Sequence, residues 1–503
     1  MATSSNAGPP RPSHTVPIAL SSLADGRGRV SGDDATVSGI TASSDRVRHG
    51  DLFAALPGRT VHGASFVASA LASGAAAVLT DDAGAATLDI DVPVLIVPDA
   101  RAALGPVSSD VYGNPARRLR MLGVTGTSGK TTTTFLMRAG LRAAGAQTGV
   151  IGTVATMIGD ERLESGFTTP EAPDLQALLA VMCERRVDTI AMEVSSHAVA
   201  MHRSDGIDFD VAAFTNLSED HLDFHRDMED YFATKLRFVR SAARAVVIVD
   251  DQWGRRAADA TGPGTTTIST DGSAATVRAI DVRERADGTT TFAALGPWGS
   301  QDLGCAIPGR YNVANTALAW TILHSCGITG PRIAEAIGAA QVPGRMERIS
   351  AGQPYLAVVD YSHKPAAVDG ALRALRPLTD GRLIIVLGCG GDRDTGKRPH
   401  MGAIATRGAD VLIVTDDNPR SEEPGAIRAA MLEGALSVPP GQRGTVIEIG
   451  DRAVAIVAAV ARARAGDTVL IAGKGHETGQ EIAGTVHPFD DRIVLRAAIE
   501  DRR

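Results

Sequence analysis

A run of glycine, hydroxyl and lysine residues between positions 123 and 134 is the strongest chemical signal in this sequence. It reads Gly-Val-Thr-Gly-Thr-Ser-Gly-Lys-Thr-Thr-Thr-Thr, after an apolar segment that predicts a buried strand and before a helical pattern. Glycines let backbone N–H groups surround phosphates, and a helix N-terminus favours negative charge. Lys130 would therefore contact the β- and γ-phosphates of a nucleotide, and the Thr131 hydroxyl would bind Mg²⁺.

The loop differs from the common Walker pattern, which has a glycine where this chain has Val124. Its local form, Gly-Thr-Ser-Gly-Lys-Thr-Thr at residues 126–132, is more compact. A glycine- and threonine-rich turn before an ordinary helix is the alternative interpretation. The order of strand, glycines, Lys-Thr and helix favours nucleotide binding.

Acidic and histidine side chains follow later strands of the same region. Glu193 can bind Mg²⁺ directly or through water, or simply cap a helix, and the adjoining Ser-Ser-His favours a polar site. His221 and His225 would share one face of a helix and could bind zinc. A single histidine pair without a third ligand favours positioning of substrate or of metal-bound water instead. Lys235 by itself predicts an exposed helix lysine.

A third group of polar residues, near the C-terminus, carries both signs of charge. It comprises Asp-Asp-Asn-Pro-Arg at 416–420 and Gly-Lys-Gly-His-Glu at 473–477. Arginines such as Arg420 bind carboxylates as a fork, and acids such as Glu477 bind ammonium groups. Together they suit a zwitterion, although a surface ion pair is the alternative for each residue alone.

These motifs need elements to hold them, and 503 residues are enough for about three domains. Residues 1–17 are rich in serine, proline and glycine without an apolar core, which predicts a disordered tail rather than a secretory signal. Residues 18–113 alternate short apolar runs with an alanine-rich helical segment, as a small α/β domain does. Residues 114–343 predict parallel strands with crossover helices, and residues 344–503 repeat that rhythm.

The apolar runs predict particular strands. A surface hairpin is expected within residues 274–303, a helix over 313–324 and another over 451–464. Strands are expected at 51–56, 75–79, 92–97, 147–154, 188–194, 211–214, 245–249, 355–361, 383–387, 411–415, 445–449 and 468–472.

Composition narrows the class of protein. Hydrophobic residues make up 44% of the chain, and the formal net charge is −8 without a long basic run, which argues against nucleic-acid binding. The four cysteines are scattered, as in reduced proteins of the cytoplasm. No apolar stretch approaches the length of a membrane span. A cytoplasmic protein that does not enter the membrane is expected.

The motifs occur in an order that resembles the Mur ligases of peptidoglycan synthesis, over roughly residues 30–495. The resemblance implies a small N-terminal α/β domain that binds UDP, a central P-loop domain with a mostly parallel sheet, and a C-terminal Rossmann-like α/β domain. It implies an enzyme that uses ATP and Mg²⁺ to phosphorylate a substrate carboxylate to an acyl phosphate, which an amine then attacks. It points to the members that join meso-diaminopimelate to UDP-MurNAc-L-Ala-D-Glu. A monomer is expected.

The resemblance also implies roles for individual residues. Lys235 matches a lysine that the family carbamylates, which would make it a metal ligand. The implied ATP-binding residues are Gly126, Thr127, Ser128, Gly129, Lys130, Thr131, Thr132, Asn312, Arg345 and Asp360. The implied catalytic residues are Lys130, Glu193, His221, Lys235 and His363, and the metal ligands are Thr131, Glu193, Lys235 and His221. The UDP-sugar-peptide would contact Ala42, Ser44, Arg59, Thr60, Val61, Thr168, Thr169, Ser195 and Arg203. Diaminopimelate would contact Arg393, Asp417, Asn418, Pro419, Arg420, Gly473 and Glu477.

Three alternatives remain open at this point. A ligase that adds L-lysine is disfavoured by Arg420, because lysine lacks the second carboxylate that an arginine would bind. A folylpolyglutamate synthetase would leave the first domain and the mixed-charge residues unexplained. A P-loop NTPase without ligase activity would hydrolyse ATP without needing an amino acid.

Overall fold

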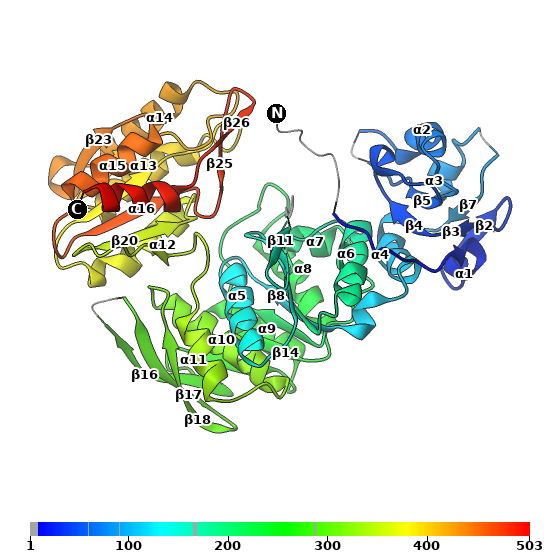
Figure 1. Ribbon diagram of the computed structural model, residues 1–503, viewed down its shortest axis with the longest axis horizontal. Helices are drawn as coiled ribbons and strands as arrows, with labels where there is room; N and C mark the ends of the chain where they lie inside the picture. Colours follow the sequence, from blue (N-terminus) through cyan, green and yellow to red (C-terminus); the bar gives the residue numbers. More distant parts are fainter. Residues whose placement is uncertain (1–8, 59, 90, 164–167, 286–287, 503) are drawn as a thin grey trace. The chain divides into compact units, whose positions relative to one another are not determined.

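The computed structural model describes residues 9–58, 60–89, 91–163, 168–285 and 288–502 (Figure 1). The chain forms two compact units. The first contains residues 1–278 and 317–333, and the second contains residues 279–316 and 334–503. Within these units three mainly parallel sheets confirm the predicted α/β fold class, whereas the predicted domain limits at 113/114 and 343/344 stay predictions.

The N-terminal part of the first unit is built on a five-stranded sheet in the order β2-β7-β6-β5-β4. All neighbours are parallel except β2 and β7. Its core packs Leu20, Leu52, Leu79 and Leu104 together, all of them almost fully buried. The elements are α1 (Leu20–Ala24), β2 (Arg29–Ser31), β4 (Gly39–Thr41), β5 (Asp51–Ala54), α2 (Val67–Ala72), β6 (Ala77–Thr80), α3 (Asp82–Ala85), β7 (Val94–Ile96) and α4 (Ala100–Val111).

A disordered tail is the wrong description for residues 9–17, the part of the predicted 1–17 segment that the structure describes. Arg11 forms an ion pair of 2.7 Å with Asp51, whose side chain is 3% exposed. The backbone N–H and hydroxyl of Ser13 both donate to Glu184. No local pattern predicts these contacts, because both partners lie far along the chain.

The rest of the first unit belongs to a longer sheet whose described strands have the order β11-β10-β9-β12-β8-β13-β14-β15-β16-β17-β18, with β17 and β18 in the second unit. From β9 to β16 all neighbours are parallel, which confirms the predicted crossover pattern, and β10 and β11 add an antiparallel edge. The strands are β8 (Arg120–Thr125), β9 (Thr148–Ile151), β10 (Thr156–Ile158), β11 (Glu161–Leu163), β12 (Thr189–Glu193), β13 (Val211–Phe214), β14 (Ala245–Ile248), β15 (Thr266–Ser269) and β16 (Val277–Glu284). The helices are α5 (Lys130–Ala143), α6 (Ala172–Glu184), α7 (Ser196–Ala200), α8 (Met228–Ser241) and α9 (Gln252–Thr261).

The second unit is built on a sheet in the order β19-β20-β24-β21-β22-β23. Its neighbours are parallel except β19 and β20, so the carboxyl ends of β20, β21, β22 and β24 share one edge. The strands are β19 (Glu347–Arg348), β20 (Leu356–Asp360), β21 (Leu383–Leu387), β22 (Val411–Val414), β23 (Thr445–Glu448), β24 (Thr468–Ala472), and the hairpin β25 (Gly479–Ile482) and β26 (Thr485–Pro488). The helices are α12 (Pro365–Leu375), α13 (Lys397–Gly408), α14 (Pro424–Ser437), α15 (Arg452–Arg462) and α16 (Asp491–Asp501).

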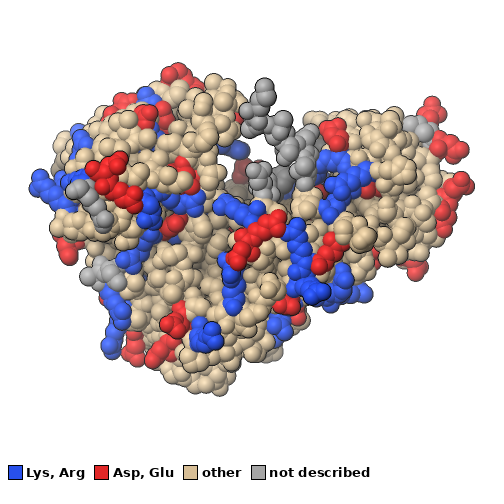
Figure 2. Space-filling view, in the orientation of Figure 1, with Lys and Arg blue, Asp and Glu red and all other residues tan. Residues whose placement is uncertain are grey.

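The region expected to be one hairpin contains three strands. β16 ends at Glu284, and β17 (Thr290–Gly296) and β18 (Gly299–Cys305) pair as an antiparallel hairpin. The expected helix at 313–324 is α10 (Tyr311–Ser325), and β16 and α10 both run from one unit into the other. Basic and acidic side chains are interspersed over the visible face of the molecule (Figure 2). Among the described residues, every helix is too short or too polar to span a bilayer.

Candidate active site

The glycine-rich loop connects the end of β8 to the first turn of α5, as the sequence predicts. Gly129 precedes the helix in a left-handed conformation, with φ of 88°, and Lys130 is the first helical residue. The Lys130 ammonium lies back over the loop, donating to the carbonyls of Gly126 at 2.7 Å and Thr127 at 2.9 Å. The backbone and the helix N-terminus thus form the cradle that phosphate groups need.

The segment after β13 holds this loop in place. The Thr215 hydroxyl donates to the Ser128 carbonyl at 2.6 Å, and the Asn216 side chain accepts from the Ser128 N–H at 3.0 Å. Gly126 has a φ of 143°, and a Cβ at this position would collide with the Thr215 hydroxyl. The contact requires glycine, and Thr215 and Asn216 hold the compact loop in place.

Glu193, at the end of β12, is 1% exposed and accepts three hydrogen bonds. The Thr131 hydroxyl donates at 2.9 Å, the Thr153 N–H at 2.9 Å and the Thr153 hydroxyl at 3.1 Å. A hydroxyl and a carboxylate therefore meet at the N-terminus of α5. These oxygen donors fit Mg²⁺, so the predicted pairing of Thr131 with Glu193 has the right chemistry for that ion. Thr153 was not expected from the sequence, where it is one of many threonines.

Lys235 is not the exposed helix lysine that its spacing alone predicts. It lies on α8 with 1% exposure, and its ammonium donates to the Gly126 carbonyl at 2.9 Å. The ammonium also lies 4.6 Å from the centre of the Tyr231 ring. Burial and the nearby positive charge of Lys130 hold the pKa of Lys235 well below its ordinary value. The result is a buried amine with weakened proton affinity beside the phosphate loop.

The two histidines do not share a helix face, so the premise of the zinc hypothesis is wrong. Residues 221–225 form a turn, and His221 has a φ of 55°. His225 is buried, with its Nε2 2.9 Å from the Ser196 hydroxyl. The His221 and His197 rings lie edge to face with their centres 4.7 Å apart. Among the described residues, no group of three histidine, cysteine or acidic side chains is arranged to hold a metal.

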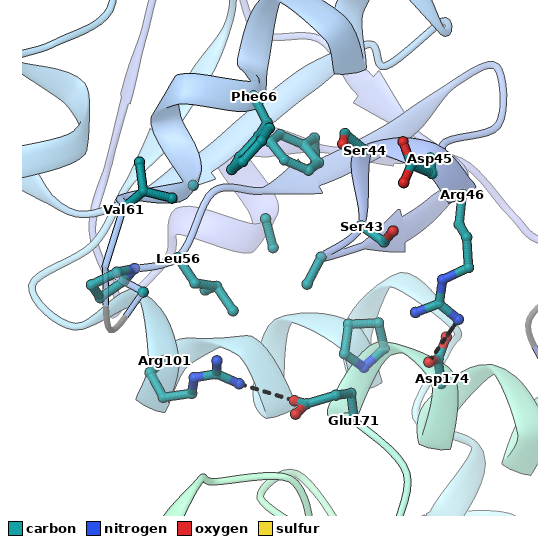
Figure 3. Close-up of a pocket in the computed structure, with 17 residues that line it drawn as sticks. Ser43, Ser44, Asp45, Arg46, Leu56, Val61, Phe66, Arg101, Glu171 and Asp174 are labelled. Carbon is teal, nitrogen blue, oxygen red and sulfur yellow. Dashed lines mark hydrogen bonds and ion pairs between the residues drawn. The ribbon is translucent and has the colours of Figure 1, made fainter. Parts of the chain in front are cut away.

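A cavity of about 490 Å³ lies between the N-terminal sheet and the start of α6 (Figure 3). Two ion pairs border it, Arg46 with Asp174 at 3.0 Å and Arg101 with Glu171 at 2.9 Å. Of the residues expected to hold UDP, Ala42, Ser44 and Val61 line it, Thr60 does not, and Arg59 lies outside the described residues. Phe66, Arg101 and the α6 residues were not predicted from the sequence, since nothing local connects them with residues 42–61.

The residues expected to hold the peptide part of the substrate lie next to Glu193. The Thr168 hydroxyl is 2.9 Å from that of Thr153, and the Thr169 hydroxyl donates to the Glu193 carbonyl. The Ser195 N–H donates to Thr169 at 3.3 Å. Arg203 donates to the Thr169 carbonyl and forms an ion pair of 2.8 Å with Glu171, which also lines the cavity. These residues connect the cavity with the phosphate loop within one unit.

In the second unit, three residues expected to contact ATP have different surroundings. Asn312 is buried, and its side-chain N–H donates to the Pro308 carbonyl at 2.7 Å, so it stabilises the start of α10. Asp360 accepts from the N–H groups of Met346 at 2.7 Å and Ser362 at 2.9 Å. The Arg345 guanidinium lies 4.4 Å from the centre of the Tyr361 ring. Asp360 and Arg345 therefore belong to one cluster at the end of β20.

His363 belongs to the same cluster. Its Nδ1 lies 2.7 Å from the Tyr361 carbonyl, an acceptor, so Nδ1 carries the proton and Nε2 has the lone pair. Burial lowers the pKa of His363 to about 4. The ring is therefore neutral at neutral pH and can accept a hydrogen bond or a proton at Nε2.

The mixed-charge residues come together at the carboxyl ends of β22 and β24. Asn418 donates to the Glu477 carboxylate at 2.9 Å, and the fully buried Lys474 donates to both, at 3.0 Å to Asn418 and 3.1 Å to Glu477. Gly473 has a φ of 117°, and a Cβ there would collide with the Asp417 carboxylate. Lys474 stands in a run that the sequence analysis singled out, but its role could not be seen without the fold.

Arg420 follows these residues and has an unusual backbone conformation. Its φ is 54°, and it is held by hydrogen bonds from its N–H to the Glu481 carbonyl and from the Ala483 N–H to its own carbonyl. Its guanidinium donates to the Gly391 carbonyl at 2.6 Å and lies 3.3 Å from the Glu481 carboxylate. Pro419, between Asn418 and Arg420, is in the same loop, whereas Arg393 is an exposed side chain.

Comparison with known proteins agrees with this geometry. Family models described as "Mur ligase family, catalytic domain", "Mur ligase middle domain" and "Mur ligase, glutamate ligase domain" match residues 36–112, 124–323 and 344–475. The chain is 52% identical to a UDP-N-acetylmuramoyl-L-alanyl-D-glutamate--2,6-diaminopimelate ligase of Streptomyces avermitilis, with 98% of each chain covered. It is 48% identical to the protein of that name from Corynebacterium glutamicum, over 90% of this chain and 89% of that one.

A solved structure with the same name superposes with a TM-score of 0.71 at 31% identity, covering 97% of this chain and 99% of the other. ATP-dependent acid–amine ligases are the class of enzyme that this fold and these motifs define. The chain belongs to the Mur ligase family, which confirms the predicted resemblance.

Proposed function

We propose that this protein joins meso-diaminopimelate to UDP-MurNAc-L-Ala-D-Glu in peptidoglycan synthesis, with ATP as the source of energy. The observation that carries the proposal is the mixed-charge cluster of the second unit, where Arg420, Asn418 and Glu477 lie on the loops after two strands of one sheet edge. Ligands bind at that edge in open α/β sheets. The names of the similar ligases support the same substrates.

The first unit has the groups that a phosphoryl transfer requires. Lys130 and the N-terminus of α5 would neutralise the phosphates, and Thr131 with Glu193 would hold Mg²⁺. That ion would supply charge neutralisation between phosphate oxygens. The cavity of Figure 3 would take the UDP group, and Thr169, next to Glu193, would direct the substrate's free carboxylate towards the phosphate loop. Positioning and charge neutralisation are the main contributions of the protein.

We propose that Lys235 is carbamylated. The neutral amine attacks carbon dioxide, a C–N bond forms, one C=O pair moves to oxygen, and the amine loses a proton to solvent. Burial of the side chain and its lowered pKa support the reaction, because only the unprotonated amine is a nucleophile. The product carries a carboxylate, which can bind a metal as no lysine can. The metal contact expected of His221 and the phosphate contact of His363 also remain proposals.

Specificity for diaminopimelate over lysine would come from Arg420. The far end of diaminopimelate has a carboxylate, whereas lysine has only an ammonium group there. An arginine fork binds the first, whereas the ammonium end of a lysine substrate would be repelled by the guanidinium. We further propose that the protein acts as a monomer, since one chain supplies every proposed contact. We also propose that it acts in the cytoplasm.

The test is phosphate release from ATP with UDP-MurNAc-L-Ala-D-Glu and either meso-diaminopimelate or L-lysine as the amine, with the product identified by mass. Release that depends on diaminopimelate, with a tripeptide product, is expected. Release with lysine instead would keep the ligase activity and refute the role of Arg420. Steady ATP hydrolysis that needs neither amine would refute the ligase assignment and favour a P-loop NTPase.

A further inference from the structure

Arg452, the first residue of α15, is a fully buried charge in the second unit. Its Nε and Nη2 donate to the two carboxylate oxygens of Asp491, both at 2.7 Å, and neither side chain is exposed to solvent. Asp491 is the first residue of α16. Buried ion pairs usually give no more stability than a well-packed apolar pair, because both charges lose their hydration. Stability alone is therefore a weak reason for this pair.

The rest of the guanidinium contacts the ends of two strands. Its Nη2 donates to the carbonyl of Ala472, the last residue of β24, at 2.9 Å. Its Nη1 donates to the carbonyl of Asp416, just after β22, at 3.3 Å. The residues that follow, Gly473 and Asp417, begin the two loops of the mixed-charge cluster. One side chain thus bonds to the base of both loops.

These two strands are not neighbours, because β21 lies between them in the sheet. No ladder hydrogen bonds join β22 to β24 directly. Each strand pairs with β21, and the spacing of the loops that follow β22 and β24 depends also on contacts that cross β21. Arg452 makes such a contact beneath the loops, and Lys474 makes a second one among the side chains of Asn418 and Glu477. Burial opposes a rise in the pKa of Arg452, but the charges of Asp491, Asp417 and Glu477 produce one. The guanidinium therefore interacts electrostatically with acidic side chains of both loops.

We propose that Arg452 and Asp491 are positioning residues for the amine substrate: they set the spacing of the 416–420 and 473–477 loops, and α16 acts on the site through them. The proposal rests on the proposed amino-acid site. Both loops must be correctly spaced at once, because one carries Asp417 and Arg420 and the other carries Glu477. An error in their spacing weakens binding of an amino acid that touches both, and leaves the nucleotide loop of the first unit unaffected.

The chain offers a control ion pair in the same sheet, at the amino ends of β21 and β24. Arg382 and Asp467 form an ion pair of 2.9 Å just before β21 and β24, and Arg382 also donates to the Arg462 carbonyl at 2.6 Å. Removing this pair disturbs the same sheet away from the loops. A purely structural role for Arg452 and Asp491 would produce the same pattern of effects as this control.

The test compares the full-length wild type with Arg452→Met/Asp491→Leu, Arg452→Lys and Arg382→Met/Asp467→Leu. The double variant avoids an unpaired buried charge, so that folding is preserved. We expect it to raise the KM for diaminopimelate at least tenfold, while the KM for the UDP substrate changes less than twofold. Arg452→Lys keeps the charge but not the fork, and should give an intermediate KM. The control double variant should lower Tm without a selective change in any KM.

Amide hydrogen exchange gives a second readout that needs no substrate. In Arg452→Met/Asp491→Leu, exchange should become faster in both 416–420 and 473–477, whereas the control should affect residues near 382 and 467. Uniform changes in all KM values, or unchanged loop exchange with only a lower Tm, would overturn the proposal. If phosphate release by the wild type does not depend on diaminopimelate, the proposed function is refuted. The hydrogen-exchange result would still test whether Arg452 and Asp491 position the two loops.

Discussion

Replacing Lys235 with methionine should remove most of the ligase activity and leave the fold intact. The side-chain nitrogens of Lys130 and Lys235 lie 2.7 Å and 2.9 Å from the same Gly126 carbonyl oxygen. The two nitrogens are therefore no more than about 5.6 Å apart, the sum of those distances. At an effective dielectric constant of about 20, two unit charges at that separation interact by about 3 kcal/mol.

Carbamylation changes the sign of this interaction. A protonated Lys235 would repel the Lys130 ammonium and push it away from the phosphate-binding position. A carbamate would instead attract Lys130 and any bound cation. Methionine keeps a similar volume but loses that attraction, and about 3 kcal/mol corresponds to a roughly hundredfold loss of rate. The contribution of bound Mg²⁺ adds to this figure, so a hundredfold loss of turnover is the minimum expected.

The assay is phosphate release under saturating substrates, with thermal unfolding as the control for folding. Lys235→Met should still unfold in one cooperative transition, because methionine fills the buried site with a similar volume. Carbon-13 NMR in labelled bicarbonate should show a carbamate carbonyl signal in the wild type that the variant lacks. In Lys235→Ala, acetate should restore part of the activity by entering the space that the shortened side chain leaves. Wild-type turnover in Lys235→Met, or identical carbonyl spectra, would refute the reasoning.

Three further predictions concern other charged groups. Arg420→Ala should raise the KM for diaminopimelate roughly 10- to 100-fold, from the loss of about 1.5–3 kcal/mol of charged hydrogen bonding, and an unchanged KM would place the pocket elsewhere. His363 has a pKa of about 4 in the folded state against 6.5 for the free side chain, so the unfolded chain binds more protons between these values. The free energy of unfolding should thus fall by up to about 3 kcal/mol as the pH drops through that window, and His363→Asn should weaken the dependence in urea titrations. Arg11→Met should lower the free energy of unfolding by about 3 kcal/mol, because it leaves Asp51 buried without its ion-pair partner. The control Arg29→Met removes an exposed ion pair and should lower it by less than about 1 kcal/mol. Equal effects of the two variants would show that the N-terminal segment has no structural role.

Much of the fold could be predicted from the sequence because its elements carry strong local patterns. The strands at 211–214, 383–387 and 468–472 are continuous apolar runs and have the predicted bounds. The hairpin of β25 and β26 was not predicted, since its strands are mostly polar and lack the alternation that marks a half-buried strand. The contacts of Arg11 and Ser13 were also missed, because a composition typical of disorder says nothing of individual buried side chains.

The sequence by itself determined the phosphate loop of this protein. Gly126, Gly129, Lys130 and Thr131 follow one another, and a strand, a turn and a helix N-terminus are local structures. Only the tertiary structure decided that Thr153 shares Glu193 with Thr131, that Lys235 lies buried against the Gly126 carbonyl, and that Arg452 joins the bases of two loops. Such pairs are separated by tens of residues, and no local pattern encodes them. They form because the parallel sheets bring the ends of distant strands to a single edge.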